Sequence, residues 1–534
     1  MTNLGSTGML RAVSGAILAA GVAALIGLGL AAASNAAAAA SAGVPAAPPW
    51  TDGLPFADTY AFDPQFNGSG YFFDRFAGRT DADYLGRKIA KLDDGSYVVA
   101  GLLPRPGTSA PADQLGLVHY SATGERLVWP DADAAYSVYG GQYVVYPQGT
   151  AGQPPGSFLG VAGVQAYGGY IYVLTTEYLL DGSQAERPTM LVFSAGGAWR
   201  QWVTYHPGGD VKKPAVGFTI DRGTNRLIVL GDDYNGGSYR QFWLSAYAIG
   251  AGGALTFDGG FGFPFYAAPS AVCAAGAVVD GHCSMRAAAI TTAGTQLTFP
   301  QLAAGFYVAA TRTWQGLDTD MCVIRLSSSG APSTSFGNDG HMCISFDDGG
   351  SQADAAAAIV RHSEFTLTPP FVRDHVYVSG SVERSQRPGV GVFELDGGGE
   401  LVPAFGGSGL LLFGGCGSGA GNCDFDNRAD TPYGMTFDGD ALAIAGVHTK
   451  YGSDNSVAFV NGMLAVIGAT DGGLRNFRDY STQQGETWFL DVVPDGGGRY
   501  VVGGDARIDA DGGRLVYLTA RLQPDDTIFH DGFD

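Results

Sequence analysis

The sequence carries little positive charge. Only 30 Lys and Arg residues stand against 51 Asp and Glu residues, which gives a formal net charge of −21 and a pI near 4.6. Such a surface repels phosphate backbones and anionic lipids, so nucleic acid is excluded as an expected partner. The same acidity is typical of a soluble, exported protein.

Long apolar runs are scarce as well. The one run of spanning length is residues 12–33, which follows a lone Arg11 and precedes a small-residue tract that ends at Ala42. We interpret residues 1–42 as a signal peptide with a small-residue leader, and residues 43–55 as a flexible linker. A retained membrane anchor is the alternative. No second run has this length, so we expect no membrane span once the signal is removed.

Catalytic signatures are missing from the sequence. It contains no GxSxG, HExxH, Walker or dinucleotide-binding motif in a strand-to-helix context. The eight histidines are scattered, and no two of them have metal-ligand spacing. His448, which follows an apolar strand, is a candidate for one end of the fold or else a hydrogen-bonded loop histidine. Catalytic residues therefore stay unknown, and no cofactor is expected.

Cysteine is sparse, and its six members come in close pairs: Cys273 with Cys283, Cys322 with Cys343, and Cys416 with Cys423. Zinc binding fails on spacing, because the chain has no CxxC and no His at the required distance. An even count in an exported chain predicts three local disulfides. Cys322 and Cys343 fall on successive predicted strands of one hairpin, where a cross-strand bridge is geometrically natural.

A short apolar strand, usually ended by Gly, recurs along the chain. Its copies, about 56 to 79 residues apart, read YVVAG (97–101), IYVLT (171–175), LIVLG (227–231), FYVAA (306–310), VYVSG (376–380), LAIAG (442–446) and YVVGG (500–504). Apolar residues at nearly consecutive positions indicate strands that are covered on both faces. Glycine at the strand end fits a bend or a close backbone approach near a crowded axis. A strand-rich repeat of this length predicts an all-β fold, a β-propeller.

Each repeat reads as four strands joined by polar turns, and seven copies predict seven blades in a single domain, residues 56–534. The predicted blades begin near Asp81, Gln153, Val216, Ala287, Ala353, Asp430 and Trp488. The segment 352–361 has helix propensity from its alanines, but its register places it on a first strand. The last repeat lacks a fourth strand, and residues 62–76 read as one. We predict that this N-terminal strand completes the last blade and closes the ring.

Two weak groups of binding candidates stand out. Asp505, Asp509 and Asp511 offer hard oxygen ligands for calcium, although they lack the EF-hand pattern, and an exposed acidic hairpin loop is the alternative. Trp199 and Trp202 are expected at the edge of the second blade, where they either stack on sugar rings or pack between blades.

One stretch resembles a known family. Residues 318–340, DTDMCVIRLSSSGAPSTSFGNDG, resemble the delta-60 repeat of exported bacterial proteins through an apolar run, Arg325, Gly330 and the turn Phe336-Gly337. Further matches are Phe62-Asp63-Pro64 with Phe66, PAFG at 403–406, and Arg521. The resemblance implies a propeller-like fold and carries no established reaction or binding residues. Residues 528–534 also resemble a tail of exported Gram-negative proteins, so the expected location is secreted, periplasmic or at the cell surface of a Gram-negative bacterium.

These observations favour a binding or scaffold module that presents loops to a protein or glycan partner. The alternative is an extracellular hydrolase or lyase that acts on a polymer in the axial funnel. An enzyme needs at least two titratable side chains in that funnel, so the residues found there test the alternative. The sequence leaves the ligand and the oligomeric state open.

Overall fold

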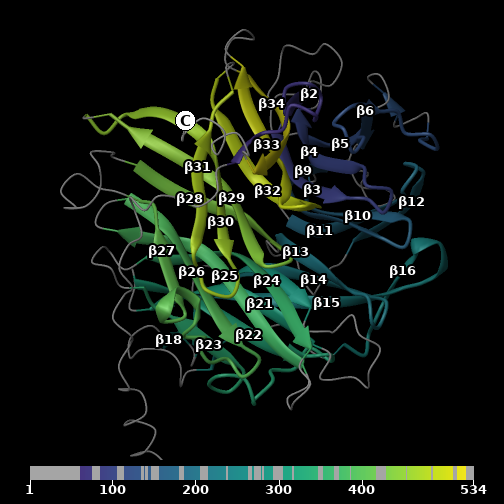
Figure 1. Cartoon of the computed structure of the whole chain (residues 1–534). Coiled ribbons are helices and arrows are strands. Elements are labelled where there is room, and N and C mark those ends of the chain that lie inside the picture. Colours follow the sequence, from purple (N-terminus) through teal and green to yellow (C-terminus); the bar gives the residue numbers. More distant parts are fainter. Residues whose placement is uncertain are drawn as a thin grey trace, which may run out of the picture. The chain divides into compact units, whose positions relative to one another are not determined.

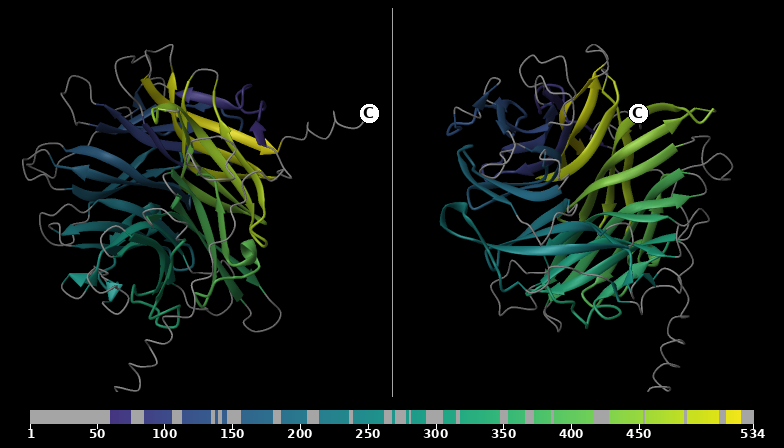
Figure 2. Two further views of the ribbon diagram at one scale, coloured as in Figure 1. Left: turned by 90° about the vertical axis from the view of Figure 1, so that its left-hand side faces the viewer. Right: turned by 180° about the vertical axis from the view of Figure 1, so that it is seen from behind.

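Strands dominate the chain, and they form seven antiparallel sheets that follow one another around a ring (Figure 1, Figure 2). The innermost strand of each sheet contacts the innermost strand of the next, and the last of them, in blade 7, contacts the first, in blade 1. This closed circuit confirms the predicted seven-bladed β-propeller. The inner strands begin within a few residues of the predicted blade starts, and the alanine-rich segment 352–361 lies in a strand, as predicted.

The computed structural model describes residues 60–524 except 75–84, 105–112, 134–136, 139–141, 146–155, 180–185, 205–213, 236–238, 262–267, 270–277, 280–281, 293–304, 315–317, 347–352, 366–371, 385–386, 416–427, 453, 483–484 and 509–513. All of these belong to one compact unit, Ala47–Asp534. The predicted signal peptide and linker lie outside the described residues. Within the described part of the chain, no helix has the length and apolarity needed to cross a membrane.

Blades 1 to 3 are built from consecutive strands, from the inner strand outwards. Blade 1 contains β3 (Leu85–Lys91), β4 (Tyr97–Pro104), β5 (Asp113–Tyr120), β6 (Arg126–Leu127), β7 (Ser137–Val138) and β8 (Gln142–Val145). Blade 2 contains β9 (Ser157–Tyr167), β10 (Tyr170–Tyr178), β11 (Glu186–Ser194) and β12 (Trp199–Thr204). Blade 3 contains β13 (Ala215–Asp221), β14 (Arg226–Asn235), β15 (Tyr239–Ile249) and β16 (Leu255–Phe257), with the 3-10 turn η1 (Ala251–Gly253).

Blades 4 to 7 follow the same order. Blade 4 contains β20 (Met285–Thr292), β21 (Gly305–Trp314), β22 (Asp318–Ser327) and β23 (His341–Ile344), and a small sheet of β17 (Ala268–Pro269), β18 (Val278–Val279) and β19 (His282–Cys283) precedes it. Blade 5 contains β24 (Asp354–Phe365), β25 (Val372–Arg384), β26 (Arg387–Asp396), η3 (Phe405–Gly407) and β27 (Leu410–Phe413). Blade 6 contains β28 (Arg428–Asp438), β29 (Ala441–Tyr451), β30 (Val457–Gly468) and β31 (Leu474–Tyr480). Blade 7 contains β32 (Thr487–Gly496), β33 (Arg499–Ile508) and β34 (Arg514–Pro524).

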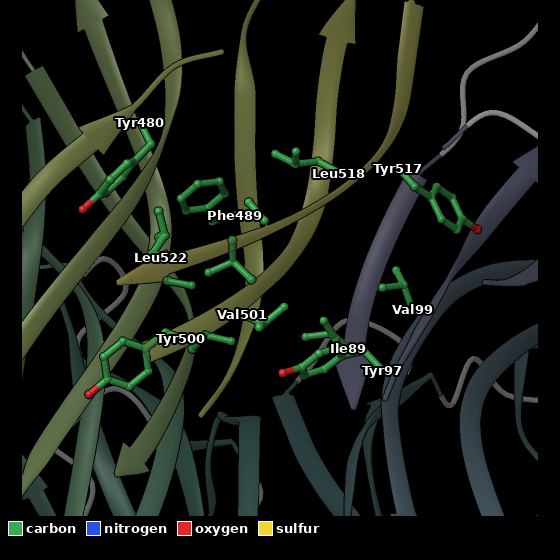
Figure 3. Packing of buried hydrophobic residues seen from close by; sticks show 14 of the residues in the cluster. Ile89, Tyr97, Val99, Tyr480, Phe489, Tyr500, Val501, Tyr517, Leu518 and Leu522 are labelled. Atoms are coloured by element: carbon green, nitrogen blue, oxygen red, sulfur yellow. The ribbon is translucent and has the colours of Figure 1, made fainter. Parts of the chain in front are cut away.

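The N-terminal segment closes the ring, as predicted. Strands β1 (Tyr60–Phe62) and β2 (Tyr71–Asp74) both pair antiparallel with β34, and they supply the missing fourth strand of blade 7. Arg521 on β34 donates from Nε to Asp63 Oδ2 at 2.7 Å and from Nη1 to the Ala122 carbonyl of blade 1 at 2.8 Å. Figure 3 shows the apolar core at this seam, with Ile89 of blade 1 beside Val501 of blade 7. Among the described residues, β34 is therefore an interior strand of blade 7 rather than its edge.

The Phe-Gly turns that carry the family resemblance join neighbouring blades. Phe66, Phe336 and Phe405 are fully buried. In each case the next residue is left-handed and donates its backbone N–H to a turn of the following blade: Asn67 to Thr123, Gly337 to Gly398, and Gly406 to Asp471. A left-handed conformation favours Gly or Asn, which explains those residue types after the phenylalanine.

The recurring glycine of the second strands lies opposite a β-bulge. In all seven blades the pairing of the first two strands skips one inner-strand residue near its start. A Cβ on Gly101, Gly446 or Gly504 would clash with the carbonyl oxygen of Leu85, Thr431 or Trp488 in the bulged strand. The predicted close backbone approach is therefore confirmed. Blades 2 and 4 carry Thr175 and Ala310 at this position instead.

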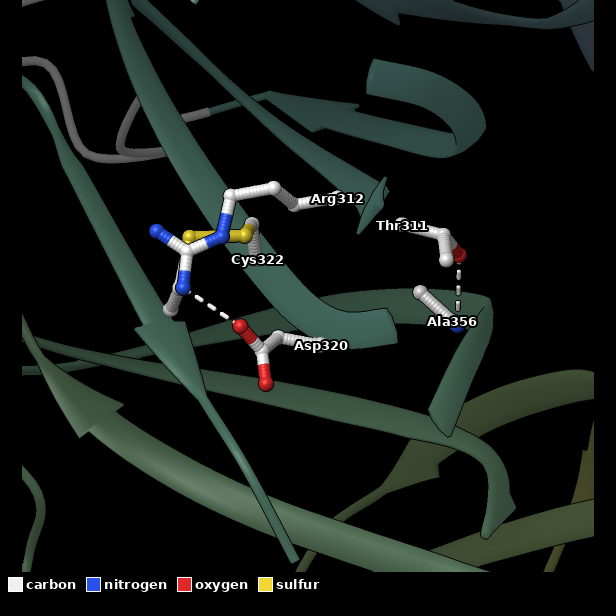
Figure 4. Close-up of a disulfide and its surroundings, with 6 residues drawn as sticks. Thr311, Arg312, Asp320, Cys322 and Ala356 are labelled. Atoms are coloured by element: carbon white, nitrogen blue, oxygen red, sulfur yellow. Dashed lines mark hydrogen bonds and ion pairs between the residues drawn. A yellow bond between two sulfur atoms is a disulfide. The ribbon is translucent and has the colours of Figure 1, made fainter. Parts of the chain in front are cut away.

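The disulfide prediction is confirmed for one pair. Cys322 on β22 and Cys343 on β23 are register partners and form a disulfide with a Cα–Cα distance of 4.0 Å (Figure 4). Arg312 forms an ion pair with Asp320 close by. The pairs Cys273–Cys283 and Cys416–Cys423 lie outside the part of the chain whose side chains are described.

Candidate functional site

A pocket of about 470 Å³ opens among the inner strands of blades 7, 1, 2 and 6. Its lining residues are Leu85, Arg87, Lys88, Val161, Tyr433, Trp488, Leu490, Asp505 and Leu515. Most of these belong to inner strands, near the end at which those strands begin. The pocket therefore lies at one end of the propeller axis.

The β-bulges place side chains in this pocket. Opposite the recurring glycine position, the skipped inner-strand residues are Arg87, Ala162, Val216, Ala288, Ala357, Tyr433 and Leu490, one per blade. Strands β9 and β32 each carry a second register shift, at Leu159 and Asp495. Three of them, Arg87, Tyr433 and Leu490, line the pocket. A bulge turns the extra residue out of the ladder and re-aims its side chain, which is why bulges recur beside functional sites.

The ring of bulge residues is chemically lopsided. Blades 2 to 5 contribute alanine and valine, which carry no hydrogen-bonding side chain. Blades 6, 7 and 1 contribute tyrosine, leucine and arginine, and Lys88 and Asp491 follow two of these bulges directly. Among these bulge residues, polar side chains therefore come only from blades 6 and 1, on either side of blade 7.

Asp491 bridges the inner strands of these blades. Its Oδ2 accepts the backbone N–H of Ile89 in blade 1 at 3.1 Å, while its backbone lies against Gly434 of blade 6. Burial among the inner strands raises the pKa of Asp491, and the nearby Lys88 ammonium opposes part of that rise. A carboxyl group with a raised pKa is a candidate proton donor, and Lys88 is its charge partner.

Aromatic side chains form the mouth and the wall of the pocket. Tyr433 is 44 % exposed, although it projects from an inner strand. The burial of the rest of its ring raises the pKa of Tyr433, and Arg87 acts in the opposite direction. Trp488 contributes indole surface, and the Arg507 guanidinium lies 5.6 Å from its ring centroid. Flat apolar surface beside charged groups suits a ligand that has one apolar face and several polar groups.

The structure brings one of the calcium candidates to the pocket. Asp505 lies in β33, with 4 % of its surface exposed, and its charge contributes to the raised pKa of the buried Tyr517 phenol. Asp509 and Asp511 lie outside the described residues, so the calcium site stays a prediction. Among the residues that the structure describes, no group of three or more His, Cys, Asp or Glu side chains could hold a metal ion.

The other candidates have structural partners. His448 is in strand β29, and its Nδ1 lies 2.8 Å from Oδ1 of the buried Asp430. Trp199 and Trp202 are on the outer strand of blade 2, as expected, and pack into the apolar layer between blades 1 and 2. Packing between blades therefore accounts for both tryptophans, without requiring a sugar.

Sequence reasoning missed Arg87, Lys88, Tyr433, Trp488 and Asp491 as site residues. The segment 86–92, GRKIAKL, held a signal: two adjacent cations occupy the middle of a strand whose neighbours cover both faces. A buried strand has no use for such a pair unless a cavity or a counter-charge receives it. The funnel therefore contains titratable groups, and the enzyme alternative is not eliminated by the criterion set above.

No protein-family model matches the sequence, and no curated protein sequence matches it. Several solved structures are similar in fold at very low identity. A GH93 α-L-arabinofuranosidase of Fusarium graminearum has 9 % identity and a TM-score of 0.36, with 82 % of this chain and 92 % of that chain covered. Drosophila Plexin A, in complex with Semaphorin 1b, has 8 % identity and a TM-score of 0.38, with 84 % and 86 % covered. A protein of unknown function from Dyadobacter fermentans has 9 % identity and a TM-score of 0.34, with 85 % and 100 % covered.

Proposed function

We propose that this protein is an exported binding module of the delta-60 repeat type, and that the axial pocket holds part of a glycan or protein partner. The observation that carries the proposal is the lopsided pocket, in which Arg87, Tyr433 and Trp488 converge from three blades. A cavity of about 470 Å³ lies within the usual size range of small-molecule sites. It accepts one or two sugar rings, or one large side chain of a protein.

Glycan binding is favoured over protein binding by the shape of the site. Its polar and aromatic groups lie within a concave pocket between inner strands. Protein interfaces bury about 800 Å² per partner over a broad surface, whereas sugar ends enter pockets and stack on indole faces. The loops around the pocket would then contact the remainder of the glycan.

The test is a binding screen of the purified mature chain against glycans and cell-envelope fractions. Trp488→Ala removes the indole from the pocket and is expected to abolish capture of any ligand that the wild type binds. Phe257→Ala is the matched control, because Phe257 is an aromatic residue, 50 % exposed, on the outer strand of blade 3. Equal capture by wild type and Trp488→Ala would refute the pocket as the binding site.

A hydrolase or lyase is the second candidate, and it is favoured by the titratable groups at the pocket: Lys88 and Asp505 line it, and Asp491, whose pKa burial raises, adjoins Lys88. A carboxyl group that stays protonated closer to neutral pH serves as a general acid. The assay is the release of new reducing ends or unsaturated products from each glycan that the protein binds. Turnover that disappears in Asp491→Asn would support catalysis, and binding without turnover would refute the enzyme hypothesis.

A further inference from the structure

Arg87 is a positively charged side chain within the pocket wall. Its side chain leaves the β3 bulge and lines the cavity. Among the residues that the structure describes, it forms no hydrogen bond and no ion pair, and its electrostatic influence falls on the phenols of Tyr433 and Tyr517. Asp505 lies in the same pocket wall but forms no ion pair with Arg87. A half-buried guanidinium that makes no ion pair is unfavourable, and a ligand anion that does so relieves that cost.

Two acidic side chains lie at or near the site. Asp491 accepts the Ile89 N–H and is charge-matched by Lys88. Asp505 is 4 % exposed and acts on the buried Tyr517 phenol. Of the two cations that line the pocket, Lys88 faces Asp491, and Arg87 is the one whose guanidinium lies at a bulge facing the cavity. In a chain with a net charge of −21, such a cation inside a cavity is a local exception.

The rest of the pocket wall restricts what the anion is attached to. Trp488, Leu490, Val161 and Leu515 provide apolar surface, and Tyr433 adds a phenol at the mouth. A sugar ring presents one apolar C–H face to such a wall and hydroxyl groups to its polar members. The guanidinium fork matches a carboxylate in bidentate geometry.

We propose that the axial pocket selects a sugar acid, whose carboxylate is received by Arg87 and whose ring stacks on Trp488. This inference rests on the proposed glycan-binding function and narrows it to one ligand class. Free uronic acids and the ends of uronate oligosaccharides share this chemistry. The acidic surface repels long polyanions, so a short end enters more readily than the middle of a polymer.

The experiment is calorimetric titration of the wild type with matched pairs that differ only at C6: glucuronate against glucose, and galacturonate against galactose. Each pair is used as the monosaccharide and as a short oligosaccharide, which distinguishes a free acid from a chain end. The wild type is expected to bind at least one acid about tenfold or more tightly than its neutral partner. Arg87→Gln is expected to weaken acid binding by about tenfold to a hundredfold and to remove the preference.

Further variants keep the outcome interpretable. Arg222→Gln changes an exposed arginine of blade 3 and should leave binding unchanged. Arg87→Lys keeps the positive charge but loses the bidentate geometry of the guanidinium, so its affinity for the acid should lie between those of wild type and Arg87→Gln. If Arg87→Gln does not fold, Arg87→Lys takes its place in the test. Equal affinity for acid and neutral sugars, or an unaffected Arg87→Gln, overturns the sugar-acid inference and leaves glycan binding standing. An absence of binding to every sugar, acid or neutral, overturns the proposed glycan binding itself.

Discussion

Phe66 offers the most direct test of how the ring is closed. It lies between β1 and β2, with none of its surface exposed, and its ring centroid is 6.4 Å from that of Tyr97 in blade 1. The Arg521 guanidinium of blade 7 lies 5.2 Å from the same ring. Its edge also fills the space above Gly124, a left-handed turn residue of blade 1. One side chain thus joins the first and last blades.

Truncation of this side chain to alanine removes those contacts and leaves a cavity at the seam. Fully buried Phe→Ala substitutions lower the free energy of unfolding by about 3–5 kcal/mol. A domain has only about 5–15 kcal/mol of stability in total, so Phe66→Ala is expected to cause a large fractional loss. Phe336 has the same role between blades 4 and 5, and Phe336→Ala should produce a loss of similar size.

The assay is urea unfolding followed by intrinsic fluorescence and circular dichroism, with the midpoint and the slope reported separately. Phe365→Ala is the control, because Phe365 is 54 % exposed and its removal should change stability by no more than about 0.5 kcal/mol. A Phe66→Ala variant that loses less than about 1 kcal/mol, while Phe336→Ala loses several, would show that the N-terminal segment does not close the ring.

Three further outcomes follow from buried groups. Burial raises the pKa of Asp74 from 3.8 to about 6, so the native state holds more proton than the unfolded state between these values. Wild-type stability should therefore fall by about 2 kcal/mol as the pH rises from 4 to 6, and by less in Asp74→Asn, as measured by urea unfolding at each pH. The hydrogen bond with Glu394 raises the pKa of His375. The stability that protonated His375 contributes is therefore fully present below pH 6.5 and is lost as the pH rises through the higher folded pKa, which should lower the thermal midpoint. Glu394→Gln should abolish this fall in the midpoint. Replacement of both Cys322 and Cys343 by alanine removes a disulfide between residues 21 apart and should lower the free energy of unfolding by about 3 kcal/mol in the same urea assay. For each of these three predictions, an unfolding midpoint that does not change contradicts the corresponding interaction.

The fold was legible in the sequence because its local signals agree with one another. The second strands are apolar on both faces, and their terminal glycine is required by the bulged inner strand, as Gly446 against Thr431 shows. The absence of a fourth strand after β34 matched the surplus strand at the N-terminus. Each of these signals reports a local steric requirement, which a single sequence retains.

The outer edge of blade 1 departs from the four-strand repeat. Residues 127–129 are apolar like a fourth strand, but only Arg126–Leu127 pair with β5, and β8 takes the edge beside Leu115 instead. Trp129 leaves the sheet, stacks on His119 at 4.7 Å and covers Gly197 of blade 2. Apolar character alone does not distinguish a strand residue from one that packs against the neighbouring blade.

The site was beyond the reach of sequence patterns for a different reason. Arg87, Tyr433 and Trp488 are far apart along the chain and meet only when the ring closes. Arg87 and Tyr433 are aimed by bulges, and a bulge moves one side chain without changing the apolar pattern around it. A sequence motif joins residues that are close along the chain, so no motif can contain these three residues together.

The pocket and the closure seam involve the same blades. Lys88 and Asp491 belong to blades 1 and 7, and the Ile89 N–H to Asp491 hydrogen bond crosses the junction that the N-terminal strand completes. Arg87 and Trp488 thus lie on the two blades that meet at this junction, which β1 and β2 complete by pairing with β34. A ligand that contacts both side chains binds only the closed arrangement, so mass action stabilises the seam when the pocket is filled. For the proposed ligand, the free energy of binding and the stability of the closed ring are therefore linked. A substitution at the distant Phe66 is then expected to weaken binding without contacting the ligand.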